Sequence, residues 1–187
     1  PESLAYLGSF PLLLEERDLT VVHHSPFDLP PPGTAATIGC FDYLDEQALS
    51  KRLEAWHSFP RRLIVSGHDH VPAVFEMPET EGPPTPTDIV VRRPPHQGEL
   101  SVRLNPHSRY WVKAGSVGGP YRDGLAVCNT VLYDDETETL TLFRLPYPTT
   151  ALKEELEASF FVRNLATIRR YIDLLAAIDS DLPLEPH

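Results

Sequence analysis

The sequence predicts a mixed α/β (α+β) fold with a mixed or antiparallel sheet and a helix towards the C-terminal end. Two short runs rich in β-branched residues, 19–23 and 63–66, flank a helical pattern at residues 45–56, as in folds where strands and helices alternate. Strand-like runs then follow one another through residues 73–145, which favours antiparallel or mixed pairing. From Thr149 onwards, the apolar residues recur at helical spacing.

The first predicted elements are a strand and an amphipathic helix. Residues 4–14 are apolar, and residues 19–23 predict a β-strand that breaks at the following Ser-Pro pair. The proline-rich run 30–33 predicts a loop. A helix is predicted after an N-cap at Asp45, because its apolar residues fall at steps of four and three. These residues are Leu49, Leu53 and Trp56.

The middle of the chain predicts strands, turns and one proline-rich insertion. The strand-like runs are 73–76, 88–92, 99–104, 109–113, 125–133 and 139–145. Residues 78–87 hold four prolines among Gly, Thr and Glu and predict an exposed insertion, which we extend to residue 98. The acidic run 134–137 predicts the turn of a hairpin between the last two strands.

The C-terminal region predicts helix. One apolar stripe alternates steps of four and three and is formed by Phe161, Leu165, Ile168, Ile172 and Leu175. We expect this stripe to pack on its own domain; the alternative is a homo-oligomer formed through the C-terminal helix. The predicted organisation is one domain at residues 1–157, followed by a helical tail at residues 158–187.

Composition predicts a cytoplasmic globular protein. The chain has 187 residues, of which 41% are apolar and 23% are charged, enough for one domain with a sizeable core. No apolar run approaches the roughly 20 residues that span a membrane, and no positively charged leader is recognised. Cys40 and Cys128 lie far apart without CxxC spacing, so a reduced setting is expected.

The charge pattern bears on the class of partner. A formal net charge of −11 disfavours a general nucleic-acid surface. Residues 88–113 are nevertheless basic, with five Lys or Arg against two Asp or Glu, whereas residues 134–187 hold eleven acids against five bases. The basic stretch either faces an anionic substrate or forms the solvated face of a strand, and we favour the second interpretation.

Two histidines follow the apolar strand at residues 63–66. Gly67 ends the strand, and His68 and His70 come next, separated by Asp69. Open α/β sheets bind ligands at the carboxyl ends of their strands, and imidazole is the commonest metal-ligand side chain. The stretch therefore predicts a metal site, with a histidine-rich surface loop as the alternative.

Three stretches, in this order, resemble one known family. Residues 21–26 (VVHHSP) and 64–70 (IVSGHDH) end strands in histidines, and residues 115–124 (GSVGGPYRDG) form a glycine-rich loop. Together they resemble the second half of a calcineurin-like metallophosphoesterase of the small bacterial and archaeal type. That family shows a strand ending in His-Gly-Ser-Pro, a strand ending in Gly-His-Thr-His, and an Asn-Pro-Gly-Ser-Val-Gly loop before a Pro-Arg-Asp-Gly turn. The resemblance covers about residues 4–157.

The resemblance implies a metal-dependent phosphoesterase. It makes His23 and His68 ligands of one metal and catalytic residues, and it makes His70 a ligand of a second metal. The expected cofactors are two divalent ions, Mn, Fe, Ni or Zn, because neutral imidazole suits transition metals. Such a pair clamps a phosphoryl group and activates water, while a nearby histidine protonates the leaving oxygen. The implied fold is a four-layered sandwich, of which this chain would supply mainly the second sheet.

The histidine motifs depart from the family at two positions. His24 replaces a glycine, and we expect it beside the site rather than on a metal. The tandem histidines nevertheless leave open whether His23 or His24 is the ligand. Asp69 replaces a threonine, a tolerable change because that side chain need not face the metals.

The glycine-rich loop is expected to bind substrate. Lys113 and Ala114 replace the family's Asn-Pro pair, and Tyr121 is inserted before the arginine. Ser116 and the neighbouring backbone amides are suited to hold a phosphate oxygen, and Arg122 is suited to contact one through two hydrogen bonds. An ordinary surface turn is the alternative for Arg122.

The family's first-half motifs are missing before His23. These are an Asp-x-His strand end, a bridging aspartate and a Gly-Asn-His-Asp/Glu motif, and without the bridging carboxylate the three histidines would not hold two metals. Because the chain does not begin with Met, we expect the C-terminal part of a longer enzyme rather than an inactive half-domain. A non-catalytic scaffold on the same fold and a mononuclear zinc protein using His23, His68 and His70 are the competing hypotheses. Which phosphoester is the substrate is left open.

Overall fold

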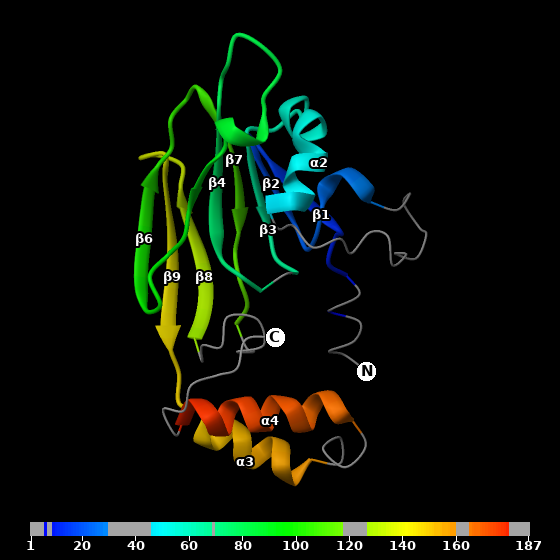
Figure 1. The fold of residues 1–187 in the computed structure, drawn as a ribbon, viewed down its shortest axis with the longest axis vertical. Helices are drawn as coiled ribbons and strands as arrows, with labels where there is room; N and C mark the ends of the chain where they lie inside the picture. The colour runs from blue at the N-terminus through cyan, green and yellow to red at the C-terminus, as the bar shows by residue number, and fades with distance from the viewer. Residues whose placement is uncertain are drawn as a thin grey trace. The chain divides into compact units, whose positions relative to one another are not determined.

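The computed structural model divides the chain into two compact units. It describes residues 6, 9–29, 46–68, 70–117, 127–159 and 165–179. The first unit comprises Pro1–Asp69, Ala73–Arg92 and Asn105–Lys113, and the second unit comprises His70–Pro72, Arg93–Leu104 and Ala114–His187. Each unit contains one sheet, as Figure 1 shows.

The first unit holds a six-stranded mixed sheet with the strand order β1-β2-β3-β7-β4-β5. Its strands are β1 (Leu13–Glu16), β2 (Leu19–Val22), β3 (Leu63–Ser66), β4 (Ala73–Pro78), β5 (Val90–Arg92) and β7 (Ser108–Lys113). β2, β3 and β7 run parallel, whereas β1, β4 and β5 pair antiparallel with their neighbours. Val22, Ser66 and Lys113 are aligned in register, so three parallel strands end at one edge of the sheet.

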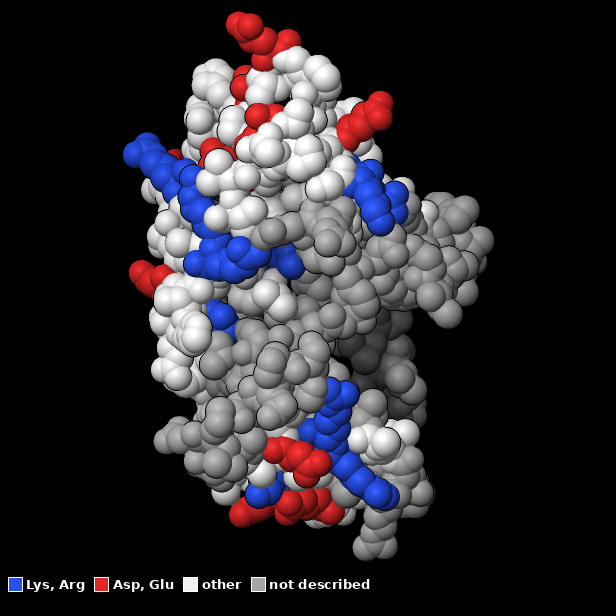
Figure 2. Space-filling view, in the orientation of Figure 1, with Lys and Arg blue, Asp and Glu red and all other residues white. Residues whose placement is uncertain are grey.

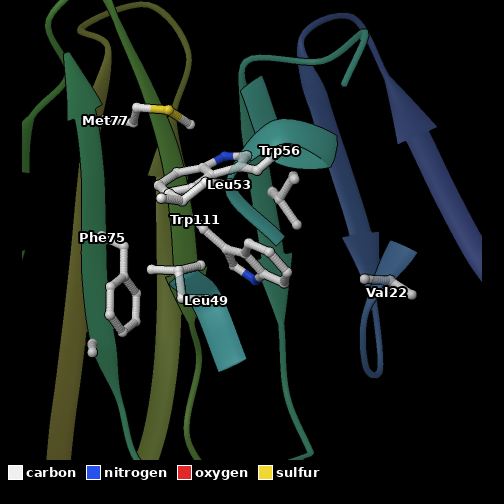
Figure 3. Packing of buried hydrophobic residues seen from close by; sticks show 9 residues of the cluster. Val22, Leu49, Leu53, Trp56, Phe75, Met77 and Trp111 are labelled. Carbon is white, nitrogen blue, oxygen red and sulfur yellow. The ribbon is translucent and has the colours of Figure 1, made fainter. Parts of the chain in front are cut away.

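Helix α2 (Glu46–His57) packs on this sheet through the apolar face that its sequence predicts. Figure 3 shows Leu49, Leu53 and Trp56 beside sheet residues of the same buried cluster, Phe75, Met77 and Trp111. The rings of Trp56 and Trp111 lie edge to face, with centroids 5.9 Å apart, a favourable arrangement for aromatic rings. The proposed N-cap, Asp45, lies outside the described residues.

The second unit holds a three-stranded antiparallel sheet with the order β6-β9-β8. The strands are β6 (Gly98–Arg103), β8 (Val127–Asp134) and β9 (Thr139–Pro146). β8 and β9 form the predicted hairpin. Its turn is held by Asp134, whose Oδ1 accepts hydrogen bonds from the backbone N–H groups of Glu136 at 3.0 Å and Thr137 at 3.2 Å, a common role of Asp in turns.

The C-terminal region forms two helices, α3 (Thr150–Ala158) and α4 (Ala166–Asp179), which lie side by side (Figure 1). Ile172 and Leu175 of the predicted stripe are buried, whereas Leu165 is 45% exposed. Phe161 lies outside the described residues. None of the described helices is long and apolar enough to cross a membrane.

The mixed α/β prediction is confirmed, with three local corrections. The chain supplies two sheets, so the expectation of mainly one sheet is too narrow. Strand β1 was not expected. Its residues are largely exposed, so its sequence does not show the alternation of apolar and polar residues that marks a half-buried strand. The predicted strand at 88–92 starts later, because η3 (Pro86–Asp88) forms a 3-10 turn before β5. Residues 79–87 are largely exposed.

Candidate metal centre

The carboxyl ends of β2 and β3 bring two histidine-bearing segments together. The parallel pairing ends at Val22 and Ser66, and one further hydrogen bond continues it, from the backbone N–H of Gly67 to the carbonyl oxygen of His23 at 3.0 Å. Residue 23 and residue 67 are therefore fixed side by side at this edge of the sheet. His68, the next residue, is held in reach of His23.

His23 and His68 form the centre of the candidate site. Nε2 of His23 lies 3.4 Å from Nδ1 of His68, and the two rings are nearly perpendicular, with centroids 5.3 Å apart. Two nitrogens bound at about 2.1 Å to one tetrahedral ion would be separated by roughly 3.4 Å. The pair therefore has the spacing of two ligands on a single metal ion.

The backbone at His68 is unusual and contributes to this spacing. Its φ is 68°, in the left-handed region that residues other than glycine rarely adopt. Holding a residue there costs on the order of 1 kcal/mol or more and occurs preferentially at functional sites. The conformation turns the chain sharply at the strand end, directly after Gly67.

His24 occupies a different environment from His23. Its side chain is 5% exposed, and Nδ1 lies 3.4 Å from the carbonyl oxygen of Ser25. The side chain of Ser25 in turn accepts a hydrogen bond from the backbone N–H of Phe27 and caps the short helix η1 (Pro26–Asp28). His24 thus packs into the turn after β2, whereas His23 is exposed and faces His68. This geometry favours His23 as the ligand.

His70 belongs to the second unit. Its φ is 65°, and its Nδ1 atom is buried and has no hydrogen-bond partner within the part of the chain that the structure describes. A buried nitrogen with no partner is costly, and a metal ion would satisfy it. Among the described residues, however, no group of three or more His, Cys, Asp or Glu side chains is placed to hold a metal. Asp69 lies outside the described part of the chain.

These residues fit part of a metal centre. The His23 and His68 nitrogens have the required spacing and the neutral imidazole chemistry of a transition-metal site. The described residues do not bring a carboxylate to this pair, so they do not complete the two-ion centre that the resemblance implies.

The start of the glycine-rich loop is well defined in the second unit. Gly115 has a φ of +80°, and the carbonyl oxygen of Ser116 accepts two hydrogen bonds from Asn129 of β8, one from its backbone N–H at 2.9 Å and one from Nδ2 at 2.8 Å. Val117 is 71% exposed. Arg122 lies outside the described residues, so its role as a substrate contact stays a prediction.

Comparison with solved structures bears on the fold. No family model matches the sequence, and no curated protein matches it. The crystal structure of a metallophosphoesterase from Sphaerobacter thermophilus matches 93% of this chain with a TM-score of 0.67 and 22% sequence identity. This chain has the metallophosphoesterase fold. It spans only 61% of the length of that protein.

Within this metallophosphoesterase fold, much of the basic stretch serves internal contacts. Arg92 donates a hydrogen bond to Glu76 at 2.6 Å, and Arg109 donates to the carbonyl oxygen of Phe59 at 2.7 Å. Lys113 is 5% exposed, with Nζ 5.7 Å from the ring centroid of Phe75. Figure 2 shows the described Lys and Arg side chains of the visible face in small groups interspersed with Asp and Glu.

Asn129, in the second unit, is a residue in contact with the glycine-rich loop that the sequence analysis missed. It lies within an ordinary strand pattern, where a single polar residue on the inner face is the only signal. Its two contacts with Ser116 join positions 13 residues apart, and nothing in the local sequence predicts that pairing.

Proposed function

We propose that this chain is part of a metal-dependent phosphoesterase that hydrolyses a phosphomonoester or phosphodiester. The observation that carries the proposal is the 3.4 Å approach of His23 Nε2 and His68 Nδ1 at the carboxyl ends of two adjacent parallel strands. The metallophosphoesterase fold supports it. We assign two divalent ions to the centre, each Mn, Fe, Ni or Zn. His23 and His68 would bind the first ion, and His70 would be a ligand of the second.

Each residue has a distinct role in this proposal. A divalent ion held by His23 and His68 would polarise the phosphoryl group as a Lewis acid and would lower the pKa of a water molecule bound to it. His23 and His68 orient the ion through neutral ring nitrogens, and the exposed position of His23 leaves it accessible to substrate. Ser116, its neighbouring backbone amides and Arg122 bind phosphoryl oxygens. The carboxylates that complete the centre come from outside the described residues.

The proposal is tested by metal content and turnover of the full-length gene product. His68→Ala removes a ligand from a half-exposed position, so we expect at least a roughly 100-fold loss of Mn²⁺ affinity by titration calorimetry. Hydrolysis of bis(p-nitrophenyl) phosphate and p-nitrophenyl phosphate should fall in parallel, while the melting temperature changes little.

His107→Ala is the matched control, because His107 is an exposed histidine that contacts Glu79 away from this pair. Its metal affinity and turnover should equal those of the wild type. Wild-type protein with verified bound metal that cleaves neither ester would rule out the proposed function.

One observation favours a second function, a non-catalytic scaffold on the same fold. Lys113 places a buried cation at the end of β7, aligned in register with Ser66 of β3, and a positive charge near a metal site weakens cation binding. The scaffold proposal predicts no metal-dependent turnover and no metal uptake by His23 and His68. The same calorimetry therefore separates the two functions.

A further inference from the structure

Asn129 contacts the glycine-rich loop through both its backbone and its side chain. Its backbone N–H and its Nδ2 donate hydrogen bonds to the same acceptor, the carbonyl oxygen of Ser116, at 2.9 and 2.8 Å. Because a carbonyl oxygen can only accept, the side-chain atom facing it must be the amide nitrogen, which fixes the orientation of the amide. Two donors converging on one oxygen hold this peptide group in one direction.

The fit between Asn129 and the loop is also steric. A Cβ atom added at Gly115 would lie 2.7 Å from Cβ of Asn129 and 2.8 Å from its Cγ. Both distances are shorter than non-bonded carbon atoms tolerate. Gly115 also has a positive φ of +80°, which glycine adopts without strain. Gly115 therefore lets the loop lie directly against Asn129.

The Asn129 side chain is polar and nevertheless buried. Asn129 is 7% exposed, and its Oδ1 accepts no hydrogen bond from the described residues. Leaving a buried amide oxygen unsatisfied costs about 1–3 kcal/mol. Among the described residues, the bond to Ser116 is the hydrogen bond that the Asn129 side chain makes.

The direction of the Ser116 carbonyl also sets the direction of the Val117 N–H. The Ser116–Val117 peptide is planar and trans, so its C=O and N–H point in opposite directions. With the carbonyl directed at Asn129, the Val117 N–H is directed away from β8. Val117 is 71% exposed, so this donor lies in a segment that solvent and ligands can reach.

We propose that Asn129 is a positioning residue that orients the Val117 N–H as a donor to a phosphoryl oxygen. This inference rests on the proposed function, and it adds a specific donor and the residue that aims it. Backbone N–H groups in such turns form anion-binding concavities, and a donor that is already oriented binds without an ordering cost.

The test compares Asn129→Asp, Asn129→Ala and Thr130→Ala in the full-length, metal-loaded protein. Asp replaces the donor facing the Ser116 carbonyl with an oxygen, so it repels the loop, whereas Ala only releases it. We expect the inhibition constant for inorganic phosphate and the KM for bis(p-nitrophenyl) phosphate to rise roughly tenfold with Ala and further with Asp. Metal content and kcat should change less than about twofold, as a positioning role requires.

Thr130→Ala is the control, because Thr130 is exposed on the same strand; it should match the wild type. Hydrogen exchange of residues 114–117 should speed up in both Asn129 variants while β9 stays protected. If the Asn129 variants fail to fold, Gly115→Ala tests the same contact from the loop side and should also raise the phosphate inhibition constant.

The outcomes separate this inference from the proposed function. Wild-type turnover together with unchanged phosphate inhibition in folded Asn129 variants overturns the positioning role and leaves the phosphoesterase intact. A wild-type protein that binds metal but cleaves neither ester overturns both. An equal loss of kcat and metal content in the Asn129 variants would assign Asn129 a structural role instead.

Discussion

At the residue scale, Glu76 shows how a charge is accommodated in the first unit. It lies on β4 with 8% exposure, and its carboxylate accepts hydrogen bonds from Arg92 at 2.6 Å, Ser108 at 2.8 Å and Tyr110 at 2.9 Å. Burial raises the pKa of Glu76, but these three donors together outweigh burial and hold it below its usual value. Burial and the neighbouring Glu76 raise the pKa of Tyr110.

We predict that Glu76 makes stability depend on pH in the acidic range. Because its folded-state pKa lies below its unfolded value, its contribution is present above the unfolded pKa and is lost as pH falls through the folded one. Glu76→Gln should lower the free energy of unfolding by about 1–3 kcal/mol at pH 7. Urea titrations should show this difference shrinking as the pH is lowered below about 4.

Glu99→Gln on β6 is the control, because Glu99 is exposed and its substitution should change stability by less than about 0.5 kcal/mol. A Glu76→Gln deficit of the same size at every pH would show that packing, rather than the charge, explains the effect.

At the element scale, α2 depends on a narrow apolar face. Leu53 is 6% exposed and Trp56 is fully buried, whereas Glu54 between them is exposed. We predict that Leu53→Ala lowers the free energy of unfolding by about 2–4 kcal/mol, because it leaves a cavity against the sheet. Urea denaturation of Glu54→Ala, the adjacent exposed control, should stay within about 0.5 kcal/mol of the wild type. Similar losses in both variants would contradict the packing.

Some elements and contacts could be predicted from the local sequence, and others could not. The α2 face and the β8–β9 hairpin follow from spacing and turn residues, and both were predicted. The closeness of His23 and His68 was implied by the family resemblance and not by local spacing; in the structure, both residues follow parallel strands that end at one edge of the sheet. The Asn129 contact with Ser116 and the Glu76 contacts with Ser108 and Tyr110 could not be predicted, since they join residues far apart in sequence. Strand β1 was missed because pairing with β2, not burial, holds it.

At the scale of the whole molecule, the family resemblance predicted more of the fold than the hydrophobic periodicity did. Strand order and the parallel core of the first sheet cannot be read from hydrophobic periodicity alone, whereas three ordered motifs predicted a fold that the solved metallophosphoesterase structure matches. The resemblance implied three histidine ligands, and the structure brings the nitrogens of two of them, His23 and His68, to 3.4 Å. The described residues place two imidazoles together without a third His, Cys, Asp or Glu side chain positioned to share a metal ion with them.

Helix α4 carries the apolar stripe that either packs within one chain or joins two copies of the molecule. Ile172 and Leu175 are 7% and 0% exposed within a single chain, so these two residues of the stripe are already covered without a second copy, and we predict that the chain does not dimerise through this helix. We expect Leu175→Ala to lower the free energy of unfolding by about 2–4 kcal/mol, independently of protein concentration. Leu165→Glu, at the exposed end of the stripe, should leave the mass in light scattering unchanged. A melting temperature that rises with protein concentration, together with a halved mass in Leu165→Glu, would instead establish the homo-oligomer through α4.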